Sequence, residues 1–336
     1  MVNLFKENLT MKKELLLTAA IMASITGTTF AAGTDFGVNS VNDGSFGVVT
    51  GTNNIVNNGA NNTLVSGYGN KTASAMNSFV GGENSQTRGK NSIAFGENAQ
   101  TNFDNTFAIG KEAVTSQYDT IAIGNGAKVS GESSVAIGRD NNITAADTTA
   151  FGANNGTIAA DQSNVFGYNN VVQGTAKEQL IFGVNSTTKE QGATVVGSHA
   201  QATAVDALAL GNNTIADVQN GVAIGTNSVT ESAVGTSNIK DNTTDIRFSN
   251  STYAGSTPDS VVSFGTNGRA GAGGVTSYTR QLQNVAAGRV SSTSTDAING
   301  SQLYDVALEA QKYNTMADGS NTTVVATDNA YGRKEF

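Results

Sequence analysis

The chain has 336 residues, only 14% of them charged, and its formal net charge is −8. This acidic balance, which no basic patch offsets, argues against nucleic acids and anionic membrane surfaces as partners. The chain contains no cysteine, which excludes a disulfide framework and the usual thiolate metal sites.

Residues 1–32 are predicted to be a secretory signal peptide. Lys12 and Lys13 form its basic region, and the apolar run from Leu15 to Ile25 is too short to span a membrane comfortably. The residues before Met11 are either an extended leader or a misassigned start. We therefore expect an exported protein.

A short apolar motif that ends in glycine recurs through residues 33–265. Ile121-Ala122-Ile123-Gly124 is one copy, and Val135-Ala136-Ile137-Gly138 follows it by 14 residues. A period this short is the signature of a solenoid, and it leaves room for two short strands and two tight turns but no helix. The sequence predicts an all-β parallel roll whose regular coils span residues 51–225. We place the coil-ending glycines at Gly51, Gly67, Gly81, Gly96, Gly110, Gly124, Gly138, Gly152, Gly167, Gly183, Gly197, Gly211 and Gly225.

The two predicted strands of each coil differ in character. In the second strand apolar and polar residues alternate, so Ala127 and Val129 are expected to point inward and Lys128 outward. The first strand is apolar on both faces, and such a strand is buried on both faces. The roll interior covers one face, so we expect another copy of the chain to cover the other. We predict that the small middle residues lie at this contact: Ala94, Ala108, Ala122, Ala136, Ala150, Ala209 and Ala223.

Two places in the array are candidates for receptor binding. Phe103 and Tyr118 fall in the second turn of adjacent coils, and Arg88 holds the place that matches Phe103 one coil earlier. Exposed aromatics beside an arginine are typical of binding hot spots. The alternative is that these aromatics only pack on each other or on a neighbouring copy.

The second candidate is an insertion in one long coil. This coil carries two extra residues within Gln173 to Gln179, and the coil before it carries one near Gly156. Insertions in a solenoid emerge at the turns, where binding sites are commonly built. We expect Tyr168, Lys177 and Glu178 to lie close together there, although a tolerated insertion is the alternative.

The 14-residue period is lost after the regular coils. Residues 226–258 are irregular and end at the only proline, and Val261 to Gly265 resembles one last coil. Residues 266–300 are assigned to a spacer and neck, with Gly268 to Gly274 as a flexible spacer. Residues 301–317 show coiled-coil spacing and begin a stalk, and the tail at 318–336 stays unassigned.

Signatures of enzymes are absent from the chain. It has no phosphate-binding loop and no His-Glu-x-x-His, and the single histidine, His199, sits at a predicted turn. We therefore predict no catalytic residue, no metal site and no cofactor. A β-solenoid enzyme would need clustered acids or a metal site on one face.

The coils together with Arg280 to Gly288 and Asp296 to Leu303 resemble the head and neck of trimeric autotransporter adhesins, the Yersinia-adhesin-like group, over about residues 33–315. The resemblance implies a left-handed parallel β-roll, a homotrimer, and a neck that joins the head to an α-helical coiled-coil stalk. The neck residues that it implies are Arg280, Leu282, Asn284, Val285, Gly288, Asp296, Ala297, Asn299, Gln302 and Leu303.

The resemblance also implies a function. Members of the family are non-enzymatic adhesins of the bacterial cell surface and outer membrane, and they contribute to virulence. The asparagine-rich head is similar to a fusobacterial adhesin of the CEACAM-binding kind, so a CEACAM-type host receptor is the expected partner. The alternatives are a matrix protein, or bacterial autoaggregation and biofilm formation. The barrel anchor expected from the family is not found in this chain, because its end lacks alternating amphipathic strands.

Overall fold

The computed structural model describes residues 34–35, 41–42, 47–57, 60–236, 253–314, 327–328 and 334–335. The predicted signal peptide lies outside these residues. The chain divides into two compact units. The first consists of the chain up to residue 232 together with residues 260–279, and the second consists of residues 233–259 and 280–336. Each unit is described by itself.

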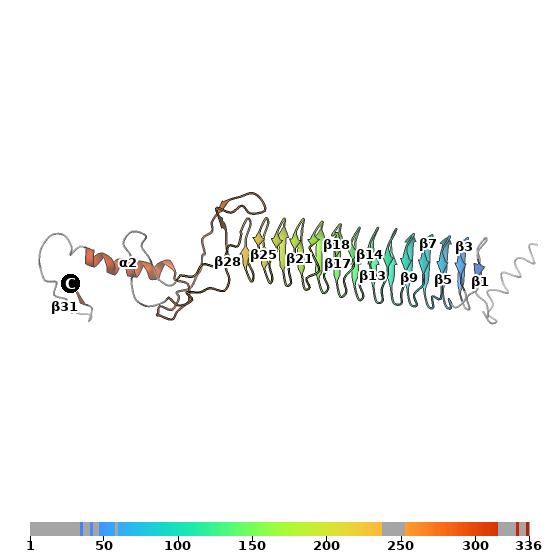
Figure 1. Cartoon of the computed structure of the whole chain (residues 1–336), viewed down its shortest axis with the longest axis horizontal. Helices are drawn as coiled ribbons and strands as arrows, with labels where there is room; N and C mark the ends of the chain where they lie inside the picture. Colours follow the sequence, from blue (N-terminus) through green and yellow to red (C-terminus); the bar gives the residue numbers. More distant parts are fainter. Residues whose placement is uncertain are drawn as a thin grey trace, which may run out of the picture. The chain divides into compact units, whose positions relative to one another are not determined.

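The first unit is a parallel β-solenoid, as predicted, in which each coil adds one strand to a long sheet. The strands follow one another in chain order, and the stack of coils is visible in Figure 1. The sheet has fifteen strands: β1 (Thr34–Asp35), β3 (Val48–Thr52), β5 (Leu64–Tyr68), β7 (Phe79–Glu83), β9 (Ile93–Glu97), β11 (Phe107–Ile109), β13 (Ile121–Ile123), β15 (Val135–Ile137), β17 (Thr149–Ala153), β19 (Asn164–Tyr168), β21 (Leu180–Val184), β23 (Thr194–Ser198), β25 (Leu208–Leu210), β27 (Val222–Ile224) and β28 (Val262–Ser263).

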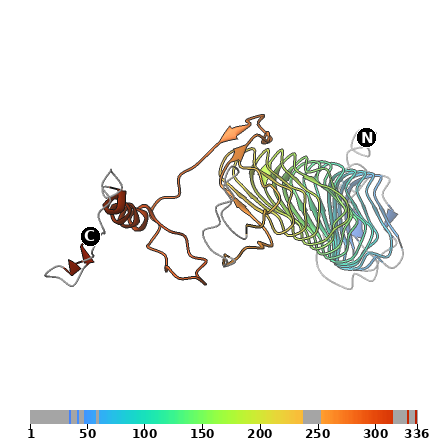
Figure 2. The same cartoon turned by 60° about the vertical axis from the view of Figure 1, so that its left-hand side comes forward.

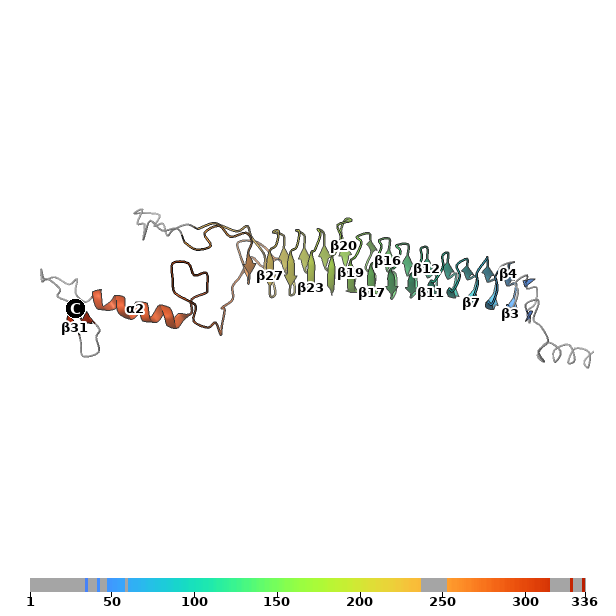
Figure 3. The same ribbon diagram turned by 90° about the horizontal axis from the view of Figure 1, so that it is seen from below.

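The second strand of each coil is only two residues long. These strands form a nine-stranded and a four-stranded sheet, seen from below in Figure 3. The nine are β2 (Val41–Asn42), β4 (Ile55–Val56), β6 (Lys71–Thr72), β8 (Gln86–Thr87), β10 (Gln100–Thr101), β12 (Val114–Thr115), β14 (Lys128–Val129), β16 (Asn142–Ile143) and β18 (Thr157–Ile158). The four are β20 (Val171–Val172), β22 (Thr187–Thr188), β24 (Gln201–Ala202) and β26 (Ile215–Ala216).

The pairing register confirms the repeat with one correction. Ile121 pairs with Val135, so equivalent residues lie one coil apart as the motif predicts. The glycine that pairs with Gly67 is Gly82, however, and Gly81 pairs with Ser66. The prediction that Gly81 ends its coil was therefore wrong by one residue, because two glycines stand together and only the second has a positive φ, of 105°.

The interior of the solenoid corrects the prediction for the middle residues of the first strand. Ala94, Ala108, Ala122, Ala136, Ala150, Ala209 and Ala223 are all fully buried within the single chain. They point into the roll. Ala122, Ala136, Ala150, Ala209 and Ala223 share a core cluster with second-strand residues such as Val129 and Ile143, and Ala94 belongs to a second cluster nearer the N-terminus. They therefore do not form an outer contact face. The predicted inward positions of Ala127 and Val129 are confirmed, and Lys128 is exposed.

The last coil of the solenoid is formed by a segment that returns from far along the chain. Val262 of β28 pairs in parallel with Val222, which confirms the predicted last coil. A hairpin follows, in which β29 (Thr266–Asn267) runs antiparallel to β30 (Ser277–Tyr278). The predicted flexible spacer is the loop of this hairpin. Its Ala272 amide donates to the Asn213 carbonyl of the solenoid, 3.2 Å away, so this loop contacts the solenoid.

Among its described residues, the second unit contains the neck and the helix α2 (Gly300–Asn314), coloured dark red in Figure 2. The helix begins within one residue of the predicted start of the stalk. Two short antiparallel strands follow, β31 (Thr327–Asp328) and β32 (Lys334–Glu335), in the tail for which no assignment was made. Among the described residues, no helix combines the length and the apolar character that a membrane span requires.

Candidate functional site

The side chains on either side of each buried middle residue form what we call the outer apolar face. In β13 the flanking residues Ile121 and Ile123 are partly exposed, while Ala122 between them is buried. Strand pairing places these flanking residues in two continuous ladders. The first ladder is Val48, Leu64, Phe79, Ile93, Phe107, Ile121, Val135, Thr149, Asn164, Leu180, Thr194, Leu208 and Val222. The second is Thr50, Ser66, Gly81, Phe95, Ile109, Ile123, Ile137, Phe151, Phe166, Phe182, Val196, Leu210 and Ile224.

Aromatic rings stack along this face. The ring centroids of Phe151 and Phe166 lie 5.4 Å apart, and those of Phe166 and Phe182 lie 4.5 Å apart, with interplanar angles of 6° for both pairs. Phe182 is nevertheless 44% exposed in the single chain. An apolar face of this kind, exposed along many coils, is typical of an interaction surface.

The edge formed by the second turns brings together the first group of predicted receptor-binding residues. The Phe103 and Tyr118 rings meet edge to face with centroids 4.9 Å apart. Arg88 donates from Nη1 to the Asn102 Oδ1 atom, 2.6 Å away, in the coil of Phe103. Tyr118 is 45% exposed and Arg88 is also exposed. The expected proximity of Phe103 and Tyr118 is confirmed, whereas Arg88 is in register with Asn102 and not with Phe103. The role of all three residues in binding stays a prediction.

The second group is only partly brought together. Lys177 forms an ion pair with Asp161, 3.2 Å apart, and the Glu178 carboxylate accepts a hydrogen bond from Gln191 at 3.3 Å. Tyr168 is the last residue of β19, beside the first turn and on the other side of β20, and its hydroxyl accepts a hydrogen bond from Asn154. The expectation that Tyr168 adjoins the insertion was therefore wrong, because the second strand separates the two turns.

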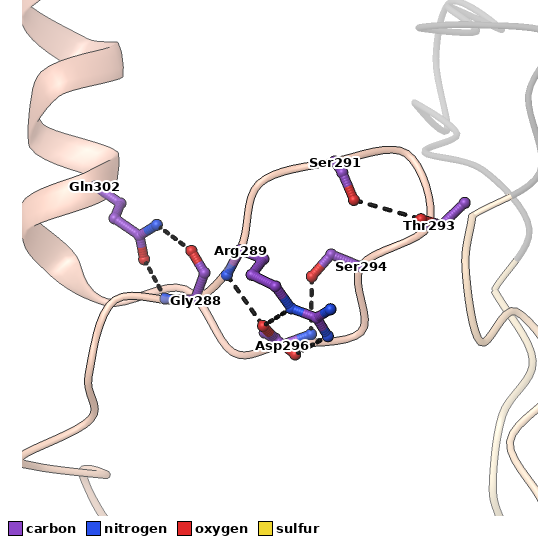
Figure 4. Close-up of polar contacts among 7 residues, drawn as sticks. All are labelled: Gly288, Arg289, Ser291, Thr293, Ser294, Asp296 and Gln302. Carbon is purple, nitrogen blue, oxygen red and sulfur yellow. Dashed lines mark hydrogen bonds and ion pairs between the residues drawn. The ribbon is translucent and has the colours of Figure 1, made fainter.

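In the neck of the second unit, side chains form hydrogen bonds to backbone groups of a neighbouring segment (Figure 4). The Gln302 amide group donates to the Gly288 carbonyl at 2.7 Å, and its oxygen accepts from the Gly288 amide at 2.9 Å. Asn299 donates to the Val285 carbonyl at 3.1 Å. Of the predicted neck residues, these four therefore meet in one place.

An ion pair closes the loop between the two neck motifs. Asp296 accepts from Arg289 Nε at 2.8 Å and from Nη2 at 3.1 Å, and the side-chain hydrogen bond from Arg289 holds the pKa of Asp296 below its ordinary value. Arg289 was missed by the sequence analysis, although it directly follows the quoted motif. Leu282 and Leu303 are more than 60% exposed, so they add nothing to the packing of the single chain.

A second ion pair, also missed, ties the hairpin to the solenoid. Arg269 Nη1 donates to Asp217 Oδ1 and to the Thr230 carbonyl, both at 2.9 Å, and Nη2 contacts Asp217 Oδ2. Burial raises the pKa of Asp217, but the hydrogen bonds and charge of Arg269 and the Thr230 hydroxyl outweigh it, so this pKa lies below its ordinary value. No periodic signal links residues 52 positions apart.

The arrangement offers no catalytic constellation in the part of the chain that the structure describes. No group of three or more histidine, cysteine or acidic side chains is placed there to hold a metal ion. His199 is exposed at a turn, and its ring nitrogens contact Ser198 at 2.9 Å and Asn185 at 3.3 Å. No carboxylate joins this small network, so it lacks the acid that would orient a catalytic histidine.

Comparison with known proteins gives two matches to family profiles. The YadA head domain repeat matches residues 88–113, 116–141 and 202–228. The coiled stalk of trimeric autotransporter adhesin matches residues 281–326. The autotransporter adhesin BtaE of Brucella suis is 41% identical over 78 residues, which are 23% of this chain and 8% of that protein. This chain therefore matches only a small part of its relative's length.

Two solved structures are also similar. The C-terminal YadA-like domain of BPSL2063 from Burkholderia pseudomallei is 28% identical, with 48% of this chain and 62% of that chain covered and a TM-score of 0.23. The collagen-binding domain of the Yersinia adhesin YadA is 21% identical, with 67% and 86% covered and a TM-score of 0.33.

Proposed function

We propose, from the premise that this chain is a trimeric autotransporter adhesin, that three copies pack their outer apolar faces together and present their second-turn edges to a host cell-surface protein. The family premise rests on the head repeats and the stalk. The observation that carries the proposal is the outer apolar face, which continues along the solenoid while the residues between its two ladders are buried in the single chain.

Another copy of the same chain suits this face better than an unrelated protein. The face repeats once per coil, at the spacing of about 4.8 Å between paired strands. A partner that matches it along its whole length must carry the same repeat, which a second solenoid of this sequence does. The stalk match over residues 281–326 supports an assembly of copies from a different part of the chain.

In this assembly the second-turn edge stays uncovered and accessible to a ligand. Arg88 and Tyr118 are exposed there, and the edge-to-face contact with Phe103 holds the Tyr118 ring in place. Rigid aromatic side chains beside an arginine are enriched at binding hot spots. Three copies would carry three such edges, so that individually weak contacts add as avidity. We propose a CEACAM-type receptor as the ligand and an exported, cell-surface location for the adhesin.

The test is a binding screen of the full chain against CEACAM-type ectodomains and the matrix proteins collagen, fibronectin and laminin. Phe103→Ala with Tyr118→Ala should weaken binding to the protein captured by at least about tenfold. The matched control is Tyr68→Ala, which removes a ring that is 50% exposed on the first-turn edge. Equal binding by both variants would remove the second-turn edge as the site, and capture of a matrix protein alone would replace the receptor proposed.

Self-association is the competing function, and the same samples distinguish it. Head-to-head assembly of purified chains would raise the particle mass with concentration beyond that of three copies. An adhesin for a host protein keeps a constant mass over the concentrations used for binding.

A further inference from the structure

The outer apolar face contains a single amide side chain. Strand pairing places Asn164 of β19 in the first ladder, between Thr149 of β17 and Leu180 of β21. Elsewhere this ladder holds valine, leucine, isoleucine or phenylalanine, apart from Thr149 itself and Thr194. Val165, the next residue, is fully buried, so Asn164 projects to the outside of the roll.

The Asn164 amide group differs from those of the asparagines around it. Asn154, Asn155, Asn169 and Asn170 all bond through their side chains to other groups of the chain. For Asn164 only the backbone amide is engaged, donating to the Gln179 carbonyl at 2.9 Å. Its side-chain amide makes no hydrogen bond to the residues that the structure describes. It is therefore an unsatisfied hydrogen-bond donor and acceptor on a face whose other residues are mostly apolar.

A regular apolar face leaves the alignment of packed rods undetermined. Because the ladders repeat every coil, one copy can slide along another by one strand spacing, about 4.8 Å, and bury nearly the same apolar area. Only a group that breaks the repeat distinguishes the correct alignment from the shifted ones. Buried asparagines act in this way in coiled coils, where a single amide specifies the register.

We propose that the Asn164 amide is enclosed between copies, hydrogen-bonds to a polar group of a neighbouring copy, and thereby fixes the axial register of the head. This inference rests on the proposed assembly through the outer apolar face. A shift by one coil would move the amide against a different rung of the ladder. Its hydrogen bond would then be lost in every copy, and an enclosed amide without a partner is costly.

The first experiment introduces a charge at this position in the full chain. Asn164→Asp should lower the melting temperature of the assembly at about pH 7 by at least about 5 °C, because carboxylates become enclosed between copies. This decrease in melting temperature should disappear at about pH 4, because burial raises the pKa of the introduced carboxyl, which is then protonated and uncharged. Asn125→Asp is the matched control, since Asn125 is exposed at a first turn and gains the same charge.

The results separate this inference from the proposed function. If the wild-type chain is monomeric by light scattering, both fail. If it assembles but Asn164→Asp and Asn125→Asp melt alike at both pH values, Asn164 is not enclosed and only this inference is overturned.

A second experiment reads the register directly. Since the chain has no cysteine, Lys128→Cys gives a single spin-labelling site, on an exposed second-strand residue. Electron–electron distance measurements should show one narrow distance between copies of this variant. Adding Asn164→Leu should keep the assembly but broaden or split the distance distribution. An unchanged narrow distance would show that the register is set elsewhere and would overturn the role given to the amide.

Discussion

The outer apolar face can be tested at Phe182, the residue at the end of its aromatic stack. Phe182 is 44% exposed in the single chain. Since a phenylalanine presents roughly 200 Å² when fully exposed, about 90 Å² remains to be covered by another copy. At about 25 cal/mol per Å² this is worth about 2 kcal/mol per copy, or about 6 kcal/mol for three copies. Phe182→Glu removes this contribution and also encloses a carboxylate.

We therefore expect Phe182→Glu to be monomeric at concentrations at which the wild-type chain assembles. The matched control is Val184→Glu, because Val184 is 40% exposed in the same strand but belongs to neither ladder of the outer apolar face. Light scattering after size-exclusion chromatography measures the mass of each variant. An assembled Phe182→Glu variant with the stability of Val184→Glu would refute the assignment of this face. Ala122→Glu should instead unfold the roll, with loss of β-structure by circular dichroism, because Ala122 points inward.

Two further predictions concern the stability of the solenoid itself. Gly124 has a φ of 135°, and an added Cβ would lie 2.1 Å from the Gly138 carbonyl oxygen. Gly124→Ala should therefore lower the free energy of unfolding in urea titrations by about 2–5 kcal/mol. The control is Gly300→Ala, whose added Cβ meets no atom within 4 Å and should change stability little. Arg269→Met should cost about 1 kcal/mol at neutral pH. Because the pKa of Asp217 is lowered in the folded state, the Arg269 ion pair adds stability above the ordinary carboxyl pKa of 3.8 and loses it as the pH falls through the lowered value. The melting temperatures of wild type and Arg269→Met should therefore converge in acid, and a constant gap would exclude this coupling.

Much of the fold followed from periodicity. The 14-residue spacing of Ile121 and Val135 predicted parallel pairing, and the alternation around Lys128 predicted which side of the second strand faces inward. Phe103 and Tyr118 fall in the second turns of adjacent coils, which predicted that they are near neighbours, and the ring geometry confirms it. These features are local or repeat at a fixed interval, so a single sequence carries them.

Tertiary structure decided what the repeat leaves open. A strand that is apolar at three successive positions does not say whether its middle or its flanking residues face inward, because alternation fits both choices. The narrow interior decides it: Ala136 and Ala150 on the first strand leave room for Ile143 and Ile158 on the second, all fully buried. Phenylalanines and isoleucines are then left outside. The Asp217–Arg269 pair joins segments separated by the irregular insertion, and only the folded chain brings such segments together.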